Sequence, residues 1–133
     1  MAHRVIEMAD RMALEGKNVL LIEDEFVIAM DIEAELESAG AHVTCASRVQ
    51  EAASAVEDGG YDAAILDLNL HGEVSFPVAD LLVAKGVPFL FHTGHGVREK
   101  LENRYPGAVV CNKPCTHTDL IRSLDSVISA RCA

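Results

Sequence analysis

Acidic, hydroxyl and amine side chains stand directly after several short apolar runs of this 133-residue sequence. They are, in chain order, Glu23 and Asp24, Asp67, Thr93, and Lys113 with Pro114 after it. If the runs are neighbouring strands, these side chains meet at one edge of a sheet. Two carboxylates about 4 Å apart repel by about 4 kcal/mol at an effective dielectric constant of about 20, so three of them need a proton or a cation. Mg2+, which takes oxygen ligands, is the cation that we expect.

Thr93 and Lys113 suit an anionic ligand opposite such a metal. A hydroxyl, an ammonium and a divalent cation together spread the charge of a transferring phosphoryl group. A carboxylate beside them can act as a nucleophile and form an acyl phosphate. Asp67 is central among the strand ends, so we predict that it is the nucleophile.

The apolar runs alternate with longer amphipathic segments over most of the chain. The runs, which we predict to be strands, are 19–22, 41–45, 63–66, 87–91 and 108–111. Five strands that alternate with helices predict an α/β fold, in which one doubly wound parallel sheet has right-handed crossovers. The functional site of such a sheet lies at the carboxyl ends of its strands.

Hydrophobic periodicity predicts the helices between these strands. The first spans 25–39 and has Gly40 as its C-terminal glycine. Ser47 and Gln50 have the spacing of a capping box for a second helix. The last helix follows a cap at Thr116 or Thr118, and the two helices before it are expected to be short.

Composition sets the class of protein. Half of the residues are hydrophobic, and 11 basic against 21 acidic side chains give a net charge of -10. This length and apolar content predict one domain with its own core. Direct binding of nucleic acid needs a clustered basic face and is excluded. No apolar run approaches the roughly 20 residues of a membrane span.

We predict an N-terminal extension over 1–16, as a weak helix or disordered, and one domain over 17–133. Glu7 and Asp10 stand where a signal peptide would need an apolar run, so we expect a cytoplasmic protein. Reduced thiols are expected at all four cysteines. These are Cys45, Cys111, Cys115 and Cys132.

These motifs resemble the receiver domain of two-component response regulators over about residues 17–130. The matching pieces are Val19-Leu20-Leu21-Ile22-Glu23-Asp24-Glu25, Ile65-Leu66-Asp67, Thr93 and Lys113-Pro114. The resemblance implies a flavodoxin-like (βα)5 fold with strand order 2-1-3-4-5. It also implies a signalling domain rather than an enzyme, as a monomer or weak dimer.

By this resemblance Asp67 is the phosphoacceptor, and its phosphoryl group comes from a histidine kinase or phosphotransfer protein. Mg2+ is implied to bind Glu23, Asp24 and Asp67 together with the backbone carbonyl of Asn69. An output protein, which the sequence does not name, would read the change.

The resemblance also gives roles to the later strand ends. Lys113 is implied to contact the phosphoryl oxygens, and Thr93 to move toward them after transfer. The Lys113–Pro114 peptide bond is cis in the family. Receivers usually have Tyr or Phe where this chain has Val110, so the usual coupling of the threonine to that aromatic cannot operate unchanged.

Two stretches resemble the FAT-GUY type of receiver. They are Asp67-Leu68-Asn69-Leu70-His71-Gly72-Glu73 with the residues after it, and Pro88-Phe89-Leu90-Phe91-His92-Thr93-Gly94. These receivers share the missing aromatic, so we expect signalling through the loop Gly94-His95-Gly96 and the short helix that follows. His92 and His95 replace the Ala and Tyr of the subgroup motif.

Other functions stay open beside the phosphoacceptor. The Glu23–Asp24 pair alone would simply favour a helix N-terminus. An interaction module that never needs phosphate, or a phosphate sink, would keep the same fold. A haloacid-dehalogenase-type phosphatase wants Asp-x-Asp after its first strand, whereas Asp67-Leu68-Asn69 follows the third. Metal binding by histidine is not expected, because loop histidines are usually solvated; the candidates are His71, His92 and His95.

Overall fold

The structure, a computed structural model, describes residues 13–94 and 96–132. Its main element is a five-stranded sheet in the order β2-β1-β3-β6-β7, with every neighbouring pair parallel. The strands are β1 (Asn18–Ile22), β2 (His42–Ala46), β3 (Ala63–Leu66), β6 (Phe89–Thr93) and β7 (Val109–Asn112). Since β6 and β7 are the fourth and fifth strands of the sheet, the predicted order 2-1-3-4-5 is confirmed.

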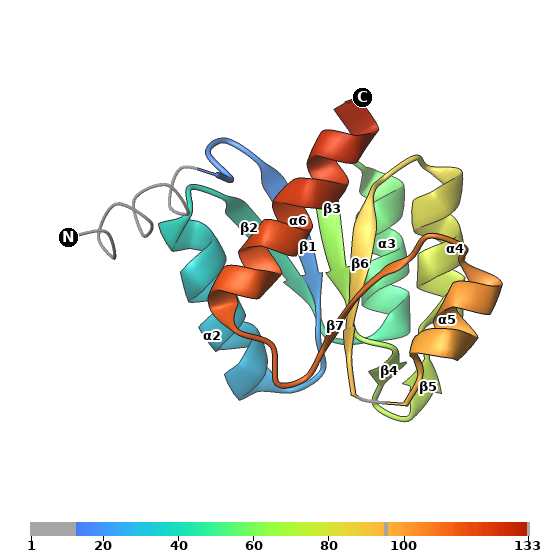
Figure 1. Cartoon of the computed structure of the whole chain (residues 1–133). Coiled ribbons are helices and arrows are strands. Elements are labelled where there is room, and N and C mark those ends of the chain that lie inside the picture. The colour runs from blue at the N-terminus through green and yellow to red at the C-terminus, as the bar shows by residue number, and fades with distance from the viewer. Residues whose placement is uncertain (1–12, 95, 133) are drawn as a thin grey trace.

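Helices cover both faces of this sheet (Figure 1). The helices are α2 (Phe26–Ser38), α3 (Val49–Asp58), α4 (Phe76–Ala84), α5 (Arg98–Arg104) and α6 (His117–Cys132). Helices α2 and α6 lie on one face, and α3, α4 and α5 lie on the other. Among the described residues, no helix is long and apolar enough to cross a membrane.

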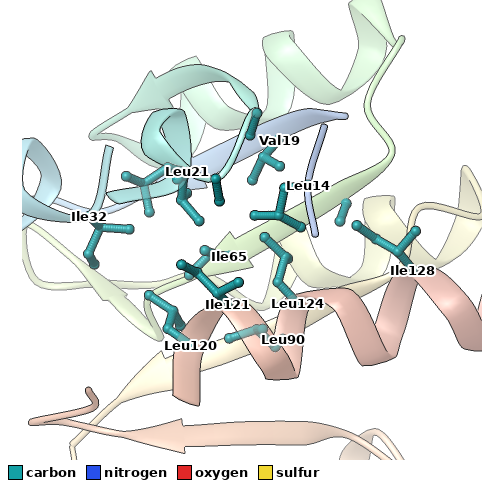
Figure 2. Packing of buried hydrophobic residues seen from close by; sticks show 14 of the residues in the cluster. Leu14, Val19, Leu21, Ile32, Ile65, Leu90, Leu120, Ile121, Leu124 and Ile128 are labelled. Atoms are coloured by element: carbon teal, nitrogen blue, oxygen red, sulfur yellow. The ribbon is translucent and has the colours of Figure 1, made fainter. Parts of the chain in front are cut away.

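Alternate residues of each central strand enter opposite cores. Leu21 and Ile65 pack toward α2 and α6 (Figure 2), whereas Leu20 and Leu66 pack toward the other three helices. Successive side chains of a strand point to opposite faces, so a strand covered on both sides must be apolar throughout. This is why β1 and β3 are continuous apolar runs in the sequence.

The described part of the N-terminal extension packs onto the domain. Leu14 is fully buried in the core between the sheet, α2 and α6 (Figure 2). Its backbone N–H donates to the carbonyl of Ala39 at 3.1 Å, and Gly16 donates to Gly40 at the same distance. We predicted a weak helix or disorder over 1–16; residues 1–12 lie outside the described residues, and residues 13–16 form a turn rather than a helix.

The predicted capping box of the second helix is wrong. Helix α3 begins at Val49 after an extended Arg48, and Gln50 makes no capping contact there. Instead, the Glu51 carboxylate accepts the backbone N–H of Ser47 at 2.6 Å. Glu51 is the third residue after Arg48, but its carboxylate accepts from Ser47 and not from Arg48, so it does not complete a capping box.

Helix α6 begins after a threonine cap, as predicted. Of the two candidates, Thr116 accepts the backbone N–H of Asp119 through its hydroxyl at 3.1 Å. Thr118 lies inside the helix. An element that we did not predict is the short antiparallel ribbon of β4 (Asn69–Leu70) and β5 (Glu73–Val74), which follows β3 directly.

Candidate functional site

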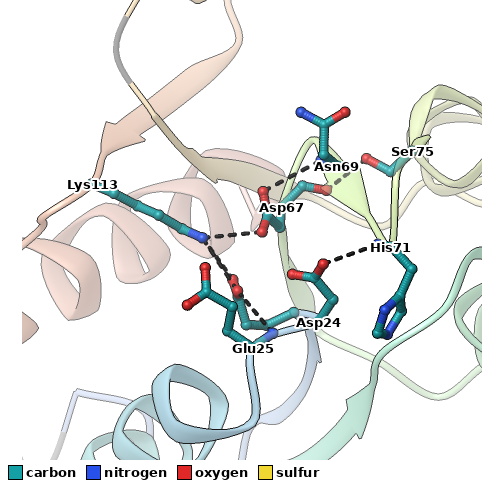
Figure 3. A network of polar contacts seen from close by, with 8 residues as sticks. Asp24, Glu25, Asp67, Asn69, His71, Ser75 and Lys113 are labelled. Carbon is teal, nitrogen blue, oxygen red and sulfur yellow. Dashed lines mark hydrogen bonds and ion pairs between the residues drawn. The ribbon is translucent and has the colours of Figure 1, made fainter.

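The predicted acidic residues and Lys113 meet at the carboxyl ends of the central strands (Figure 3). Lys113, which follows β7, extends its ammonium toward the carboxylates that follow β1 and β3. Its Nζ lies 3.0 Å from Asp67 Oδ2 and 3.1 Å from Glu23 Oε2. Both carboxylates are almost fully buried, so this contact is not a solvated surface ion pair.

The acidic residues after β1 form a tight group of oxygen ligands. Glu23, Asp24 and Glu25 each offer one carboxylate oxygen, and these atoms lie within 4.8 Å of one another. Asp67 is not part of this group, and its Oδ2 accepts from Lys113 at 3.0 Å. Glu25 is a possible ligand that we did not predict, although it stands directly beside the predicted pair in the sequence.

Burial gives Glu23 an unusual acidity. Burial raises its pKa, the nearby charge of Asp67 raises it further, and the contacts with Lys113 lower it in part, so the pKa stands at about 7. At Lys113, burial and the neighbouring charges act on the pKa in the opposite directions. Burial by itself lowers the pKa of Lys113, but hydrogen bonds to Asp67 and Glu23 outweigh it and the pKa is raised. Lys113 is therefore charged beside the two carboxylates that it contacts.

Three further hydrogen bonds hold the loop after β3. Ser75, which is fully buried, donates its hydroxyl to the backbone carbonyl of Asp67 at 2.6 Å. The backbone N–H of Asn69 donates to Asp67 Oδ1 at 3.4 Å, and that of His71 donates to Asp24 Oδ2 at 2.9 Å. We did not predict the role of Ser75, because nothing in its local sequence marks it as a partner of a residue eight positions earlier.

The ends of β6 and β7 are joined beside the acidic group. The backbone N–H of Lys113 donates to the carbonyl of Thr93 at 2.7 Å, and Thr93 is buried. The Lys113–Pro114 peptide bond is cis, as the resemblance implied. Gly94 and Gly96 continue from β6 and are exposed, whereas His95 lies outside the described residues.

His92 is not a solvated loop histidine, and that prediction is wrong. It belongs to β6, and only 5% of its surface is exposed. Its Nδ1 has no hydrogen-bond partner among the described residues. Burial, followed by the charge of Lys113, lowers its pKa to about 4. His92 is therefore neutral at physiological pH.

Val110 is buried in the core under α3, α4 and α5, at the position where receivers usually carry an aromatic. Its backbone carbonyl accepts from the guanidinium of Arg98 at 2.9 Å, which ties the start of α5 to β7. Aromatic rings fill the same core from other positions. Tyr105 packs against Phe91 with ring centroids 5.6 Å apart, and Phe89 packs against Phe91 at 5.4 Å.

Solved structures with a similar fold identify the family. SdrG from Sphingomonas melonis is 37% identical, with a TM-score of 0.71 over 91% of this chain and 98% of that chain. A response regulator receiver protein from Sinorhizobium medicae is 27% identical, with a TM-score of 0.80 over 89% of this chain and 98% of that one. The chain belongs to the receiver domain family of response regulators. Receiver domains are signalling domains rather than conventional enzymes.

A third similar structure bears on the acidic group. It is the receiver domain of a sensor histidine kinase from Pseudomonas aeruginosa, which holds a magnesium ion coordinated in its active-site cleft. It is 28% identical to this receiver domain, with a TM-score of 0.74 over 86% of this chain and 98% of that chain. No protein-family model and no curated protein matches the sequence. The FAT-GUY subgroup stays a prediction.

Proposed function

We propose that this receiver domain accepts a phosphoryl group on Asp67 and thereby switches its binding to a partner protein. The observation that carries the proposal is the contact of Lys113 Nζ with Asp67 Oδ2 at 3.0 Å beside the buried Glu23. One nearly buried carboxylate is thus held by an ammonium that can follow the charge of an incoming phosphoryl group. The donor is a histidine kinase or phosphotransfer protein of the cytoplasm.

The transfer itself needs only a bond exchange. An oxygen of Asp67 attacks the phosphorus of a phosphohistidine, the P–N bond breaks, and the imidazole of the donor takes up a proton. Lys113 then shifts its contact from the carboxylate to a phosphoryl oxygen. We infer that Thr93, whose backbone carbonyl accepts from the N–H of Lys113, then donates its hydroxyl to another phosphoryl oxygen.

A magnesium ion fits the residues at this edge. The oxygen ligands Glu23, Asp24 and Glu25 lie within 4.8 Å of one another, and burial together with the charge of Asp67 raises the pKa of Glu23. A cation bound there would favour the ionised form of Glu23. We assign the ion to Glu23, Asp24 and Asp67 with the backbone carbonyl of Asn69, and Glu25 is a further candidate. When bound, Mg2+ would neutralise the charge of the phosphoryl oxygens.

The surface beside the acidic group suits a protein donor. The first turn of α2 follows the group directly, and 75% of Phe26 and 78% of Val27 are exposed there. Met30, one turn later, is also exposed. An apolar patch rimmed by polar residues is typical of a protein interaction site. We therefore place the phosphodonor protein on α2, from where its phosphohistidine reaches Asp67.

The direct test is the intact mass of the protein after incubation with Mg2+ and acetyl phosphate. We expect one added phosphoryl group in the wild type and none in Asp67→Asn. Asp125→Asn is the matched control, because Asp125 is an exposed aspartate on α6 and should leave the adduct in place. Labelling that persists in Asp67→Asn would contradict the proposal.

A phosphate-independent interaction module is the second candidate, and Val110 is the observation that favours it. Without an aromatic there, the usual link from the threonine to the α5 side of the sheet is missing. Partner binding that is equal for wild type and Asp67→Asn, with or without a phosphodonor, would establish this function. Turnover of free phosphomonoesters, which a phosphatase would show, is not expected.

A further inference from the structure

Ser75 stands directly before α4, yet its hydroxyl does not cap that helix. A serine at this position ordinarily accepts the backbone N–H of the second or third helical residue. Here the second residue is Pro77, which has no N–H, and the N–H of Val78 donates to the backbone carbonyl of Ser75 at 3.0 Å. The hydroxyl is therefore free to bind another group.

That group belongs to the backbone of the proposed phosphoacceptor. The Ser75 hydroxyl donates to the carbonyl of Asp67 at 2.6 Å, and the Ser75 backbone N–H donates to the carbonyl of Leu68 at 2.8 Å. Ser75 is fully buried, so bulk water does not compete for these two bonds. One residue at the start of α4 thus holds two successive peptide groups of the loop that follows β3.

The chain between these points forms the β4–β5 ribbon, and the backbone of the ribbon reaches two carboxylates of the site (Figure 3). The N–H of Asn69 donates to Asp67 Oδ1 at 3.4 Å. The N–H of His71 donates to Asp24 Oδ2 at 2.9 Å, from a left-handed backbone with a φ of 50° at the turn of the ribbon. Because each bond holds one carboxylate oxygen, the position of the ribbon affects how the two carboxylates face each other.

We propose that Ser75 is a positioning residue for the divalent cation: its hydroxyl closes the ribbon onto Asp67 and so holds both carboxylates and the carbonyl of Asn69 ready for Mg2+. This role rests on the proposed function. Ser75 acts through the ligands and does not itself bind the ion. Loss of a group that orients metal ligands typically lowers metal affinity by about 10–100-fold. Without the hydroxyl, one of the two bonds at the base of the ribbon is lost.

The test compares Mg2+ binding by the full-length wild type and Ser75→Ala, with calorimetry and with the Mg2+ concentration that gives half the maximal rate of acetyl phosphate labelling. We expect Ser75→Ala to raise both the dissociation constant and that concentration about 10-fold, with the KM for acetyl phosphate at saturating Mg2+ unchanged. Ser123→Ala is the matched control, because it removes a half-buried serine hydroxyl that lies on α6, 3.4 Å from Cys111 Sγ. It should leave the Mg2+ dependence unchanged.

A second measurement uses the wild type alone, so it does not depend on the folding of a variant. Mg2+ should slow the hydrogen exchange of the three amides that fasten the ribbon, which are those of Asn69, His71 and Ser75. The slowing should exceed that of the Asp62 amide, which donates to the carbonyl of Asn18 at the amino end of the sheet. Urea unfolding of Ser75→Ala checks that the variant is folded.

Either of two results overturns the role of Ser75: equal Mg2+ affinity of wild type and folded Ser75→Ala, or exchange of the ribbon amides that Mg2+ does not slow. Labelling of the wild type on Asp67 would uphold the proposed function in both cases. A wild type that binds no Mg2+ and takes no phosphoryl group would overturn the proposed function, and the role of Ser75 with it.

Discussion

Glu23 and His92 are two buried side chains that lie near the same charges, Asp67 and Lys113, and respond to pH in opposite directions. Burial raises the pKa of Glu23 from 4.5 to about 7, so the folded state holds this proton more tightly than the unfolded state does. Burial lowers the pKa of His92 from 6.5 to about 4, so the folded state binds this proton less tightly. Each difference corresponds to about 3 kcal/mol of stability.

The two contributions offset each other in the wild type. The raised pKa of Glu23 contributes fully to the free energy of unfolding below pH 4.5, and this contribution is lost as the pH rises toward 7. The lowered pKa of His92 contributes fully to the free energy of unfolding above pH 6.5, and this contribution is lost as the pH falls toward 4. In metal-free buffer, Glu23→Gln should leave the His92 trend alone, so that the free energy of unfolding rises with pH across this range. His92→Leu should show the reverse, a free energy that falls.

Urea unfolding at several pH values between 4.5 and 6.5 measures both slopes. Glu25→Gln is the matched control for the first variant, because Glu25 is exposed and should keep the flat wild-type profile. If the free energy of unfolding of both variants changed with pH in the same direction, that result would contradict the opposite effects of burial on the pKa values of Glu23 and His92. Adding Mg2+ at neutral pH should stabilise the wild type more than Glu23→Gln.

At the scale of the elements, patterns with a fixed period could be predicted and contacts distant in sequence could not. The strands 19–22 and 63–66 were predicted because burial on both faces makes them continuously apolar, and their carboxyl ends correctly placed Glu23 and Asp67 together. The β4–β5 ribbon has only two residues in each strand, too few for a visible alternation.

Contacts distant in sequence also explain why the positions of His92 and Ser75 were not predicted. His92 reads as a polar residue before a glycine loop, but the sheet continues through it and buries it. Ser75 reads as a helix-start residue, and its bond to Asp67 exists only because the ribbon turns the chain back. The capping box was predicted because Gln50 has the spacing to reach back to Ser47, but Glu51 takes that N–H instead and the helix begins after Arg48.

The cap of α6 gives a prediction at this scale. Thr116→Ala removes the hydroxyl that accepts the Asp119 N–H, and we expect a loss of about 1 kcal/mol in the free energy of unfolding. Thr118→Ala is the matched control, because Thr118 is exposed and inside the helix, and its loss should be smaller. Urea unfolding measures the free energy of unfolding of both variants. Equal losses for the two would argue against Thr116 as the cap.

At the scale of the whole molecule, two cores share one sheet, and the site lies at the edge where both end. The core under α2 and α6 also receives Leu14 from outside the predicted 17–133 domain. Two backbone hydrogen bonds join this segment to the end of α2. We therefore expect the unit that unfolds cooperatively to begin before residue 17.

Leu14→Ala tests this extent of the domain. Removing a fully buried leucine side chain from a core costs about 2–5 kcal/mol. We expect that loss in urea unfolding, with the acetyl phosphate adduct retained, because Leu14 precedes the amino end of β1 and the site lies after the carboxyl ends of the strands. Ala13→Gly, at a half-buried neighbour, should cost less. A loss for Leu14→Ala of well under 1 kcal/mol would show that the segment is dispensable.

Reductive trapping tests the phosphoacceptor most directly. Borohydride reduces an aspartyl phosphate to homoserine, which marks the phosphorylated residue in a peptide map. After incubation of the full chain with Mg2+ and acetyl phosphate, we predict homoserine at position 67 and aspartate or glutamate at positions 23, 24 and 25 as in the sequence. Homoserine at another position, or at none under conditions that add a phosphoryl group, would contradict Asp67 as the phosphoacceptor.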